Sequence, residues 1–379
     1  MKLIHFSDTH LGYSQYSKVD AASGVNQREI DVYAAFRRVI DLILEKKPEL
    51  VIHAGDLFDT ARPSNRAIHV ALSELKRLSG AGIPIVLISG NHSTPRIASS
   101  ASIFESLGVL PGVYPVFKKH YEKIRIKDAA VHIVPHTTTE ADLKVEIEKV
   151  TVDPDAKYNI LGLHAGISGT GDYKMGEFNE LGVPKEMFSR FESFNYIALG
   201  HWHGHRTFTD IPNARYSGST ERFSFHEAGY PKGVVWFDLA TRQAEFCPIQ
   251  VREMVRLGPV DCTGKDAATV FALIEELAAR TEIAEKILQL ELTELPRATY
   301  VQLDHRAIQS KFTEAYQFSI LYALAQEAGG SGTVERTVGA LPVEFERFLE
   351  SLELPNIDKV TLLSRAVRYI GEAAERSEA

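Results

Sequence analysis

Polar side chains of one chemical kind follow five short apolar segments in the first 203 residues of the chain. They are aspartates, histidines and one asparagine, whose oxygen and nitrogen atoms serve as ligands for divalent metals. In chain order they are Asp8 and His10 in SDTH, Asp56 in GDLFD, Asn91 and His92 in GNH, His164 in LHA, and His201 and His203 in GHWH. This number of donors suits two divalent metals, with one carboxylate bridging the pair and imidazoles filling the remaining positions.

A pair of divalent metals has a direct use in the hydrolysis of phosphoesters. Two metals about 3.5–4 Å apart activate a water molecule near neutral pH and hold both the attacking and the departing oxygen. Neutral imidazole ligands leave the cluster with net positive charge, which favours an anionic phosphodiester. A glycine precedes each of Asp56, Asn91 and His201, and we expect it to allow the sharp turn that exposes the ligand.

The segments that carry these residues alternate with helical patterns, which predicts a layered α/β domain whose strand ends meet at one edge. Apolar runs predict strands at 2–8, 49–56, 83–91, 158–165 and 194–201, and further strands of a second sheet at 123–136 and 232–239. Apolar residues at helical spacing predict helices over 32–44, 64–78 and 97–107.

The pattern changes after about residue 245, where no further histidine–aspartate motif occurs. REMVRLGPVDC and KILQLELTEL look like strands on either side of a helix near 266–280, which predicts a smaller α/β accessory domain over 246–330. A glycine-rich linker at 328–335 then leads to two amphipathic helical patterns within 336–379.

Composition narrows the class of protein. The chain has 379 residues, 44% hydrophobic and 24% charged, as in an ordinary soluble globular protein. Its apolar runs are too short for a membrane helix and its start lacks the features of a signal peptide, so a cytoplasmic location is expected. Two cysteines exclude a disulfide framework and a cysteine-rich zinc site. A net charge of −8 argues against a passive nucleic-acid binder, so any DNA contact must come from a local patch or from bound metal cations.

These motifs resemble those of the calcineurin-like metallophosphoesterases. SDTHLG, GDLFDTARPS, GNH and GHWH, with their spacing, are most similar to the SbcD-type and Mre-type nucleases of DNA double-strand-break repair. The resemblance covers residues 1–245 strongly and the accessory domain only by size and order. The GDxVDRG form typical of protein phosphatases is absent, since residues 57–60 are LFDT.

The resemblance implies a fold and a ligand set. The fold is a layered two-sheet metallophosphoesterase sandwich flanked by helices, with a DNA-binding capping domain and C-terminal helices. Asp8, His10 and His203 would bind one metal, expected to be Mn(II). Asn91, His164 and His201 would bind the second Mn(II), and Asp56 would bridge the two. His92 would face the scissile phosphate and protonate the departing 3′ oxygen or stabilise its charge, help that is typically worth about 10²- to 10⁴-fold in rate.

The resemblance also implies an activity and partners. We expect a manganese-dependent DNA nuclease that acts as a 3′-to-5′ exonuclease on double strands and as an endonuclease on single strands. It would form a homodimer through helices near 64–78 and 97–107. The tail at 336–379 would dock an SbcC-type coiled-coil ATPase, although packing of the tail on the chain's own core is the alternative.

Ser93 departs from the family pattern, which has an acidic residue after the histidine. No metal ligand is lost, but a missing carboxylate can lower the basicity of His92 or loosen its orientation. Asp59, at the end of GDLFD, is a candidate replacement that would orient His92. Its change to Asn should then slow cleavage and leave the metal content unchanged.

Four further residues are candidates for contacts with the substrate. Arg62 and Arg66 would contact DNA phosphates, with a solvated helix face as the alternative. His205 would reach a phosphate beside the metals, although an ordinary surface histidine is favoured. Arg222 lies in YSGSTERFSF, where the family has a loop that lines the active site. The other histidines of the strand and helix segments are expected to be satisfied core residues: His5, His53, His69, His132 and His136.

Two rival functions are left open by the residues. The first is a metallophosphoesterase for small phosphodiesters or nucleotides, which suits the acidic net charge but does not explain the accessory domain and the tail. The second is an inactive scaffold subunit, with Ser93 as a first sign of lost activity. The intact set of seven ligand positions argues against this second alternative.

Overall fold

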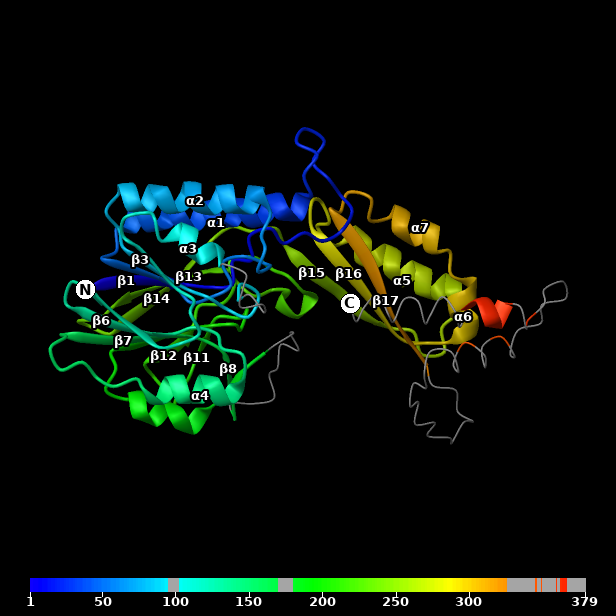
Figure 1. Ribbon diagram of the computed structural model, residues 1–379. Coiled ribbons are helices and arrows are strands. Elements are labelled where there is room, and N and C mark those ends of the chain that lie inside the picture. Colours follow the sequence, from blue (N-terminus) through cyan, green and yellow to red (C-terminus); the bar gives the residue numbers. More distant parts are fainter. Residues whose placement is uncertain are drawn as a thin grey trace. The chain divides into compact units, whose positions relative to one another are not determined.

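The first sheet extends to both sides of the N-terminal strand, β1 (Figure 1). In the computed structural model, which describes residues 1–94, 102–169, 180–325, 345, 349, 359 and 362–366, its order is β14-β13-β1-β2-β3-β4. Strands β1 to β4 are parallel, whereas β13 and β14 are antiparallel additions. The bounds are β1 (Lys2–Phe6), β2 (Leu50–His53), β3 (Ile85–Ile88), β4 (Val113–Val116), β13 (Gly233–Asp238) and β14 (Gln243–Pro248).

The second sheet has the order β11-β12-β10-β7-β6-β5. Its four inner strands are parallel, and an antiparallel strand closes each edge. The bounds are β5 (Glu122–Ile126), β6 (Ala129–Val134), β7 (Tyr158–His164), β10 (Tyr196–Gly200), β11 (Arg206–Thr207) and β12 (Ala214–Tyr216). The segment 123–136 therefore lies in a second sheet, as predicted. For 232–239 that prediction is wrong, because β13 pairs with β1 of the first sheet.

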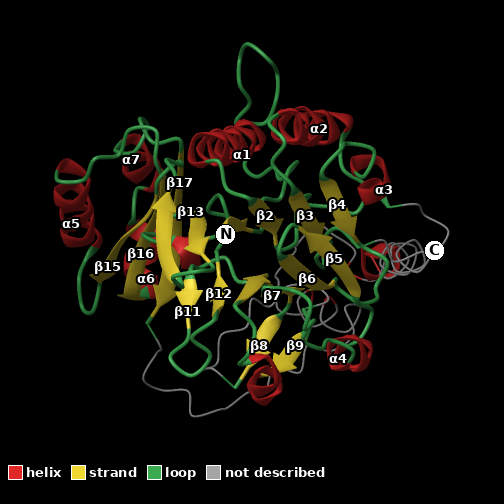
Figure 2. Cartoon of the chain, turned by 90° about the vertical axis from the view of Figure 1, so that its left-hand side faces the viewer, coloured by secondary structure: helices red, strands yellow, loops and turns green. Residues whose placement is uncertain are grey.

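Helices cover the outer faces of the two sheets (Figure 2). Three lie on the first sheet: α1 (Gln27–Lys46), α2 (Asn65–Gly80) and α3 (Ile103–Leu107). On the second sheet lie α4 (Glu140–Glu148) and the 3₁₀ helix η1 (Lys185–Phe191), beside the short pair β8 (Gly166–Ser168) and β9 (Gly182–Pro184). The sheets pack face to face through apolar residues such as Ile52, Ile88 and Ile160. This α/β/β/α layering confirms the predicted fold class.

The helix predictions depend on periodicity and hold where the structure describes the chain. Helix α1 buries Val32, Phe36 and Val39 along one face, as their helical spacing predicts. Helix α2 begins where expected, because the hydroxyl of Ser64 accepts a hydrogen bond from the Ala67 amide and caps it. Only the end of the helix predicted at 97–107 is described, as α3. Within the described ranges, no helix combines the length and apolar character needed to cross a membrane.

A third, three-stranded sheet follows the sandwich and is entirely parallel. Its strands are β15 (Met254–Asp261), β16 (Ile287–Leu295) and β17 (Gln317–Leu324), and its helices are α5 (Ala267–Ala279), α6 (Arg297–Gln302) and α7 (His305–Ser310). Their apolar side chains form a separate core. Residues Met1–Ala325 form one compact unit, which includes this sheet. The predicted linker at 328–335 and most of the predicted tail helices within 336–379 lie outside the described residues.

Candidate metal centre

The predicted ligands come from two sheets rather than from one. Asp8 and His10 follow β1, Asp56 follows β2 and Asn91 follows β3, all in the first sheet. In the second sheet, His164 ends β7, while His201 and His203 follow β10. Because the two sheets pack face to face, these strand ends meet at one end of the sandwich, and none of the seven residues is more than 8% exposed.

Two of the three groups of potential ligands among the described residues lie side by side. Ligand atoms of Asp8, His10 and His203 lie within 4.8 Å of one another, as do those of Asp8, Asp56 and His164. In the second group, His164 Nε2 is 3.1 Å from Asp56 Oδ2 and 2.9 Å from the amide oxygen of Asn91. The structure thus brings together the residues that the motifs predicted to act together, with Asp8 common to both groups.

His201 joins the cluster through its backbone and its ring. Its amide nitrogen lies 3.1 Å from each carboxylate oxygen of Asp8, and its ring centroid is 5.4 Å from that of His164. This hydrogen bond links the end of β10 to the end of β1, so it ties the ligand loops of the two sheets together.

Strained backbone marks the loops that carry these ligands. Asp8, His10, Asp56 and His201 have φ angles of 51°, 49°, 53° and 103°. Such conformations cost roughly 1–3 kcal/mol each for a non-glycine residue and persist only where the surroundings hold them. Here the loops after β1 and β2 hold each other, because the Asp8 amide donates to Gly55 O at 2.9 Å and the His10 amide to Asp56 O at 3.0 Å.

The glycines before three ligands are needed for two different reasons. Gly55 has a φ of +109° and so forms the sharp turn that was predicted. At Gly90 and Gly200 φ is not positive, and close approach is the reason. A Cβ at Gly90 would lie 2.3 Å from Asp56 Oδ1, and a Cβ at Gly200 would lie 1.9 Å from Ala54 O.

An oxygen atom holds the Nδ1 atom of three of the histidines. The distances are 3.3 Å from His10 to the Asp59 carboxylate, 3.1 Å from His203 to the Glu227 carboxylate, and 2.8 Å from His164 to the Ala54 carbonyl. Metal-binding histidines are usually held in this way, which leaves Nε2 to face the ion. His10 Nε2 is buried and has no hydrogen-bond partner among the described residues.

The charge of the donor set also fits a cation. Burial alone would raise the pKa of Asp56, but His164 and the neighbouring histidines hold it far below its usual range. Burial alone would lower the pKa of His164, yet Asp56 and Asp8 raise it to about 9. Buried carboxylates that stay ionised and attract positive charge suit a divalent metal, as do the imidazole donors beside them.

The main chain and Asp56 both contact His92. Its Nδ1 lies 2.9 Å from the backbone oxygen of Asp59, and its amide donates to Asp56 Oδ1 at 3.0 Å. The carboxylate of Asp59 lies 3.3 Å from His10 Nδ1, and its ligand atom also lies within 4.8 Å of one in the His92 ring. That Asp59 orients His92 therefore stays a prediction, and the carboxylate is also placed to orient His10, a predicted ligand.

Ser93 makes a hydrogen bond of its own. Its hydroxyl donates to the Phe58 carbonyl at 3.3 Å, and the residue is 1% exposed. A carboxylate at this position would face the carbonyl oxygen of Phe58, acceptor against acceptor. The serine is thus suited to its surroundings.

The four predicted substrate contacts separate into two pairs. Arg62 and Arg66 are exposed, and Arg66 also lies 3.5 Å from a Glu29 carboxylate oxygen. His205 instead bonds to a backbone carbonyl through Nδ1 and stacks on Phe246, with ring centroids 4.6 Å apart.

Arg222 is half-buried, and its guanidinium donates 2.9 Å hydrogen bonds to the carbonyls of Arg252 and Tyr230. Arg222 and His205 thus each contact main-chain oxygens of the protein itself. That they also touch substrate stays a prediction.

Most of the remaining histidines are buried, as predicted. His5 and His53 are fully buried, and burial lowers the pKa of each to about 3. His132 bonds to Tyr121 and Asn159 at 2.7 and 2.9 Å. His69 is the exception, because it lies on the exposed side of α2.

Three charged residues beside the site were not predicted. Glu227, in the 3₁₀ helix η2 (Phe225–Glu227), bonds to His203 and pairs with the buried Lys232, which also donates to His203 O at 2.8 Å. Although burial opposes ionisation, His203 and Lys232 hold the pKa of Glu227 far below its usual range. Glu180 lies 3.3 Å from His201 Nε2. These residues lie about 20–30 positions along the chain from the histidines that they contact, so no local motif predicts them.

Comparison with known proteins agrees with this geometry. The calcineurin-like phosphoesterase family model matches residues 1–205. The chain is 34% identical over 212 residues to the DNA double-strand break repair protein Mre11 of Sulfolobus acidocaldarius, covering 54% of this chain and 50% of that protein. It is 30% identical over 264 residues to the Mre11 protein of Thermoplasma acidophilum, covering 66% and 65%. The chain thus spans about half to two thirds of the length of these relatives.

Among solved structures, a dimetal phosphatase from Danio rerio is similar over 62% of this chain and 91% of that chain, at 10% identity and a TM-score of 0.36. The family match covers all seven predicted ligands, from Asp8 to His203. As its motifs predicted, the chain therefore belongs to the calcineurin-like phosphoesterases, a family of hydrolases that use divalent metal ions.

Proposed function

We propose that this protein is a two-metal DNA nuclease of double-strand-break repair, with Mn(II) as its metal. The observation that supports this most directly is the convergence of seven buried oxygen and nitrogen donors from two sheets at one end of the sandwich. The similarity to proteins named for DNA double-strand break repair supports the choice of DNA as substrate.

The ligands divide into two sets in this proposal. Asp8, His10 and His203 would hold one Mn(II). Asn91, His164 and His201 would hold the other, and Asp56 would be shared by the two. When bound, the two ions supply Lewis acidity and positive charge for attack of water on a phosphodiester.

His92 is the proposed proton donor to the departing oxygen. The backbone oxygen of Asp59 can only accept, so Nδ1 of His92 must carry a proton. In the charged imidazolium, Nε2 also carries a proton, and this is the proton that His92 donates. The ring is held in place by a main-chain carbonyl, which does not titrate. Because the ring is half-buried beside His10, with centroids 4.7 Å apart, it lies at the edge of the proposed metal centre.

The substrate and partners follow from the same resemblance. We propose 3′-to-5′ exonuclease activity on double strands and endonuclease activity on single strands, with Arg62 and Arg66 as phosphate contacts. The third sheet acts as a capping domain that binds DNA, and α2 and α3 contribute to a homodimer. The tail at 336–379 docks an SbcC-type ATPase, and the protein works in the cytoplasm.

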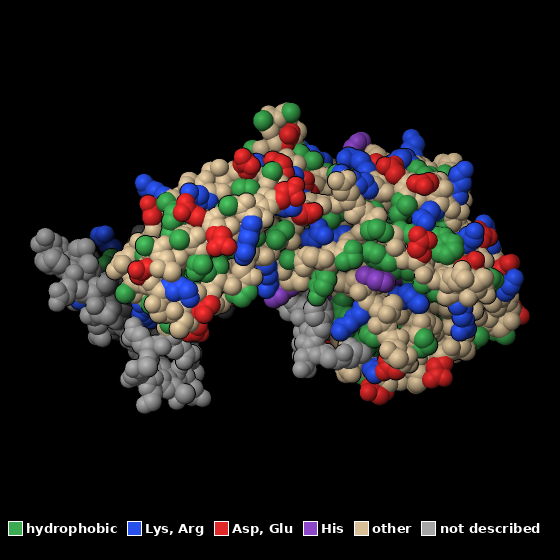
Figure 3. Space-filling view, turned by 180° about the vertical axis from the view of Figure 1, so that it is seen from behind, with side chains coloured by type: hydrophobic (Ala, Val, Ile, Leu, Met, Phe, Trp, Pro, Cys, Tyr) green, Lys and Arg blue, Asp and Glu red, His purple; other side chains and the backbone are tan. Residues whose placement is uncertain are grey.

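A metallophosphoesterase for small phosphodiesters is the second candidate function. Figure 3 favours it in one respect, because acidic and basic side chains are interspersed on the face shown rather than gathered in one basic patch. DNA binding would then depend on the metal ions and on a few arginines. An assay with both kinds of substrate separates the two functions.

The test is cleavage of an end-labelled linear duplex with Mn(II), with Mg(II) and with EDTA, beside Asp56→Ala and His92→Ala variants. Stepwise shortening from the 3′ end that requires Mn(II) and both residues is the expected result. Hydrolysis of bis(p-nitrophenyl) phosphate without cleavage of DNA, in the presence of the ATPase partner as well, would favour the small-substrate enzyme. Binding of DNA without hydrolysis of either substrate would favour a scaffold.

A further inference from the structure

One arginine links the third sheet to the sandwich. Arg252 lies in the segment 249–253 between β14 and β15, and its guanidinium binds both carboxylate oxygens of Asp31 on α1, at 2.7 and 3.0 Å. Its other terminal nitrogen bonds to Glu285 just before β16, at 2.7 Å to the carbonyl, and the group lies 4.3 Å from the ring centroid of Tyr316 before β17. Arg252 therefore holds two strands of the third sheet against α1. A two-point contact of this kind fixes direction as well as distance.

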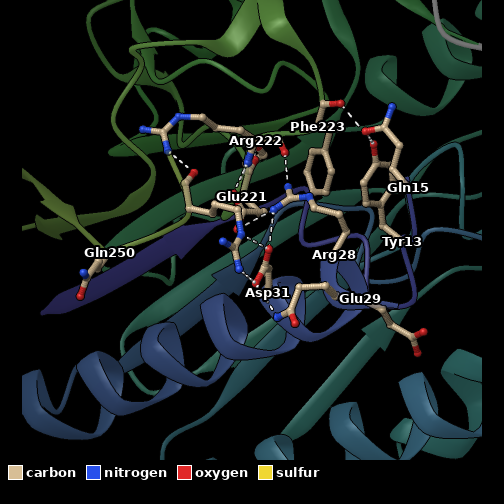
Figure 4. A network of polar contacts seen from close by, with 12 residues as sticks. Tyr13, Gln15, Arg28, Glu29, Asp31, Glu221, Arg222, Phe223 and Gln250 are labelled. Atoms are coloured by element: carbon tan, nitrogen blue, oxygen red, sulfur yellow. Dashed lines mark hydrogen bonds and ion pairs between the residues drawn. The ribbon is translucent and has the colours of Figure 1, made fainter. Parts of the chain in front are cut away.

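A second arginine extends the link from Asp31 toward the metal centre. Arg28 is fully buried and donates to Asp31 Oδ2 at 2.9 Å and to the Arg222 carbonyl at 2.6 Å (Figure 4). It also lies 3.6 Å from the carboxylate of Glu221. Asp31 thus lies between two arginines, one facing the third sheet and one facing the loop that begins at Glu221.

The loop 221–227 reaches the proposed ligands. The ring of Phe223 lies edge-on to the rings of His10 and His203, with centroids 4.8 and 5.2 Å apart. The carboxylate of Glu227, at the end of the loop, holds His203 Nδ1. Contacts therefore run without a break from the third sheet through Asp31 to two histidines of the metal centre.

Two cavities flank this junction, and an apolar cluster that includes Tyr16, Met254 and Tyr316 also contributes to it. A cavity of about 350 Å³ is lined on one side by Asp31, Arg252 and Lys286. Another of about 570 Å³ is lined by Phe225, His226 and Arg256, and Glu253 borders both. Beside the cavities, the ion pair of Arg252 and Asp31 is a charged contact between α1 and the third sheet. Their side chains are only 14% and 11% exposed, so solvent weakens the pair little.

We propose that Asp31, acting through Arg252 and Arg28, is a positioning residue that sets the third sheet beside the metal centre for long phosphodiester substrates. The proposal rests on the nuclease function proposed above. A small diester needs only the metal centre, whereas a duplex also spans the adjoining sheet. Loss of Asp31 should therefore weaken the use of DNA and spare the use of a small diester. Asp31 takes no part in breaking the bond.

The test compares the full chain with its Asp31→Asn, Arg252→Gln and doubly substituted variants on two substrates with Mn(II). For an end-labelled duplex we expect kcat/KM to fall by about 10-fold in each single variant, mainly through KM. For bis(p-nitrophenyl) phosphate we expect a change of less than about 2-fold. The double variant should lose less than the product of the two single losses, because both substitutions remove the contact between Asp31 and Arg252.

Asp41→Asn is the matched control, because Asp41 lies on the same helix and binds Arg77 at 2.6 Å without reaching the third sheet. It should leave both substrates unaffected. An equal loss on both substrates for Asp31→Asn, or no loss on the duplex, would overturn the proposal. If the wild-type chain cleaves the small diester and not DNA, the nuclease function fails by itself.

Limited digestion, a measurement that does not depend on catalytic activity, tests the positioning separately. Arg252 is a trypsin site within the segment 249–253, and its ion pair with Asp31 should protect it. Limited digestion of the Asp31→Asn variant should cut there about 10-fold faster than in the Asp41→Asn control, as expected for a junction that opens more often. Equal rates would contradict the proposed positioning. Circular dichroism and thermal melting check that the variants are folded. If Asp31→Asn does not fold, Arg252→Lys replaces it, because this substitution keeps the charge and loses the two-point contact. Arg252→Lys should show a smaller change in the same direction.

Discussion

The sandwich and the third sheet use parallel strands in different ways. In the sandwich, β2 and β3 are buried at every position, since helices cover one face and the opposing sheet covers the other. In the third sheet, β17 is partly exposed along its length, and Leu321 and Leu324 are 47% and 42% exposed. Helices cover one face of this sheet, and its core is smaller.

The two regions also differ in where they hold strained backbone. Four of the proposed metal ligands have positive φ in loops that follow buried strands. Among the non-glycine residues of the third-sheet region, positive φ occurs at Glu285 and Glu294, which belong to no ligand group among the described residues. The difference teaches that a two-sided, rigid support is what lets a loop hold a chemically useful but strained conformation. If the sandwich depends on this support more than the third sheet does, substitutions in the sandwich should have the larger effects.

The largest effect is expected for His92→Ala. Removal of the proposed proton donor should lower kcat on DNA by about 10²- to 10⁴-fold. Metal content should not change, because His92 is not a ligand in the proposed set. Parallel measurements of turnover and of bound Mn(II) by elemental analysis check this. Loss of the metal together with activity would make His92 a ligand and contradict its assigned role.

A smaller effect is expected for Asp59→Asn. Because the Asp59 carboxylate holds His10 Nδ1, its loss should weaken metal affinity by about 10- to 100-fold. This replaces the expectation from sequence alone, in which metal content was unchanged. Calorimetric titration with Mn(II) measures the affinity, and Glu227→Gln, which acts on His203 in the same way, provides the comparison. An affinity equal to that of the wild type would show that the contact is dispensable.

The buried interior of the sandwich should also make stability depend on pH through His5. Burial lowers the pKa of His5 to about 3 in the folded chain, against 6.5 for an exposed histidine. Between these values the unfolded chain binds a proton that the folded chain does not, so stability decreases as pH falls below about 6.5. From pH 7 to pH 5 the contribution of His5 is about 2 kcal/mol. Urea unfolding at both pH values should show a correspondingly smaller loss for His5→Gln, and an identical loss would contradict a neutral buried His5.

The smallest effect is expected in the third sheet. Leu321→Ser changes a side chain that is 47% exposed on the edge strand, so the free energy of unfolding should change by no more than about 0.5 kcal/mol. Urea unfolding of the full chain measures this change in the free energy of unfolding. A loss of several kcal/mol would show that this face is covered in solution, and the third sheet would then differ less from the sandwich.

The sequence allows prediction of those features that follow from a local apolar pattern or from a motif. Apolar spacing located α1 because a helix face is a property of neighbouring residues, and the helix predicted over 64–78 agrees with α2. It assigned 232–239 to the wrong sheet, because an apolar strand pairs equally well on either sheet until its partner is known. The motifs predicted seven ligand positions, and the fold brings all seven to one end of the sandwich.

What the sequence determined by itself is the chemistry that is available: the carboxylate, amide and imidazole donors at strand ends, and the family to which they belong. The tertiary structure alone decided how these donors are held. It distributed the ligands over two facing sheets, turned the Asp59 carboxylate toward His10, and brought Glu227 and Lys232 to His203. These contacts join residues more than 20 positions apart. They arise from the packing of whole layers, which no local pattern in the chain records.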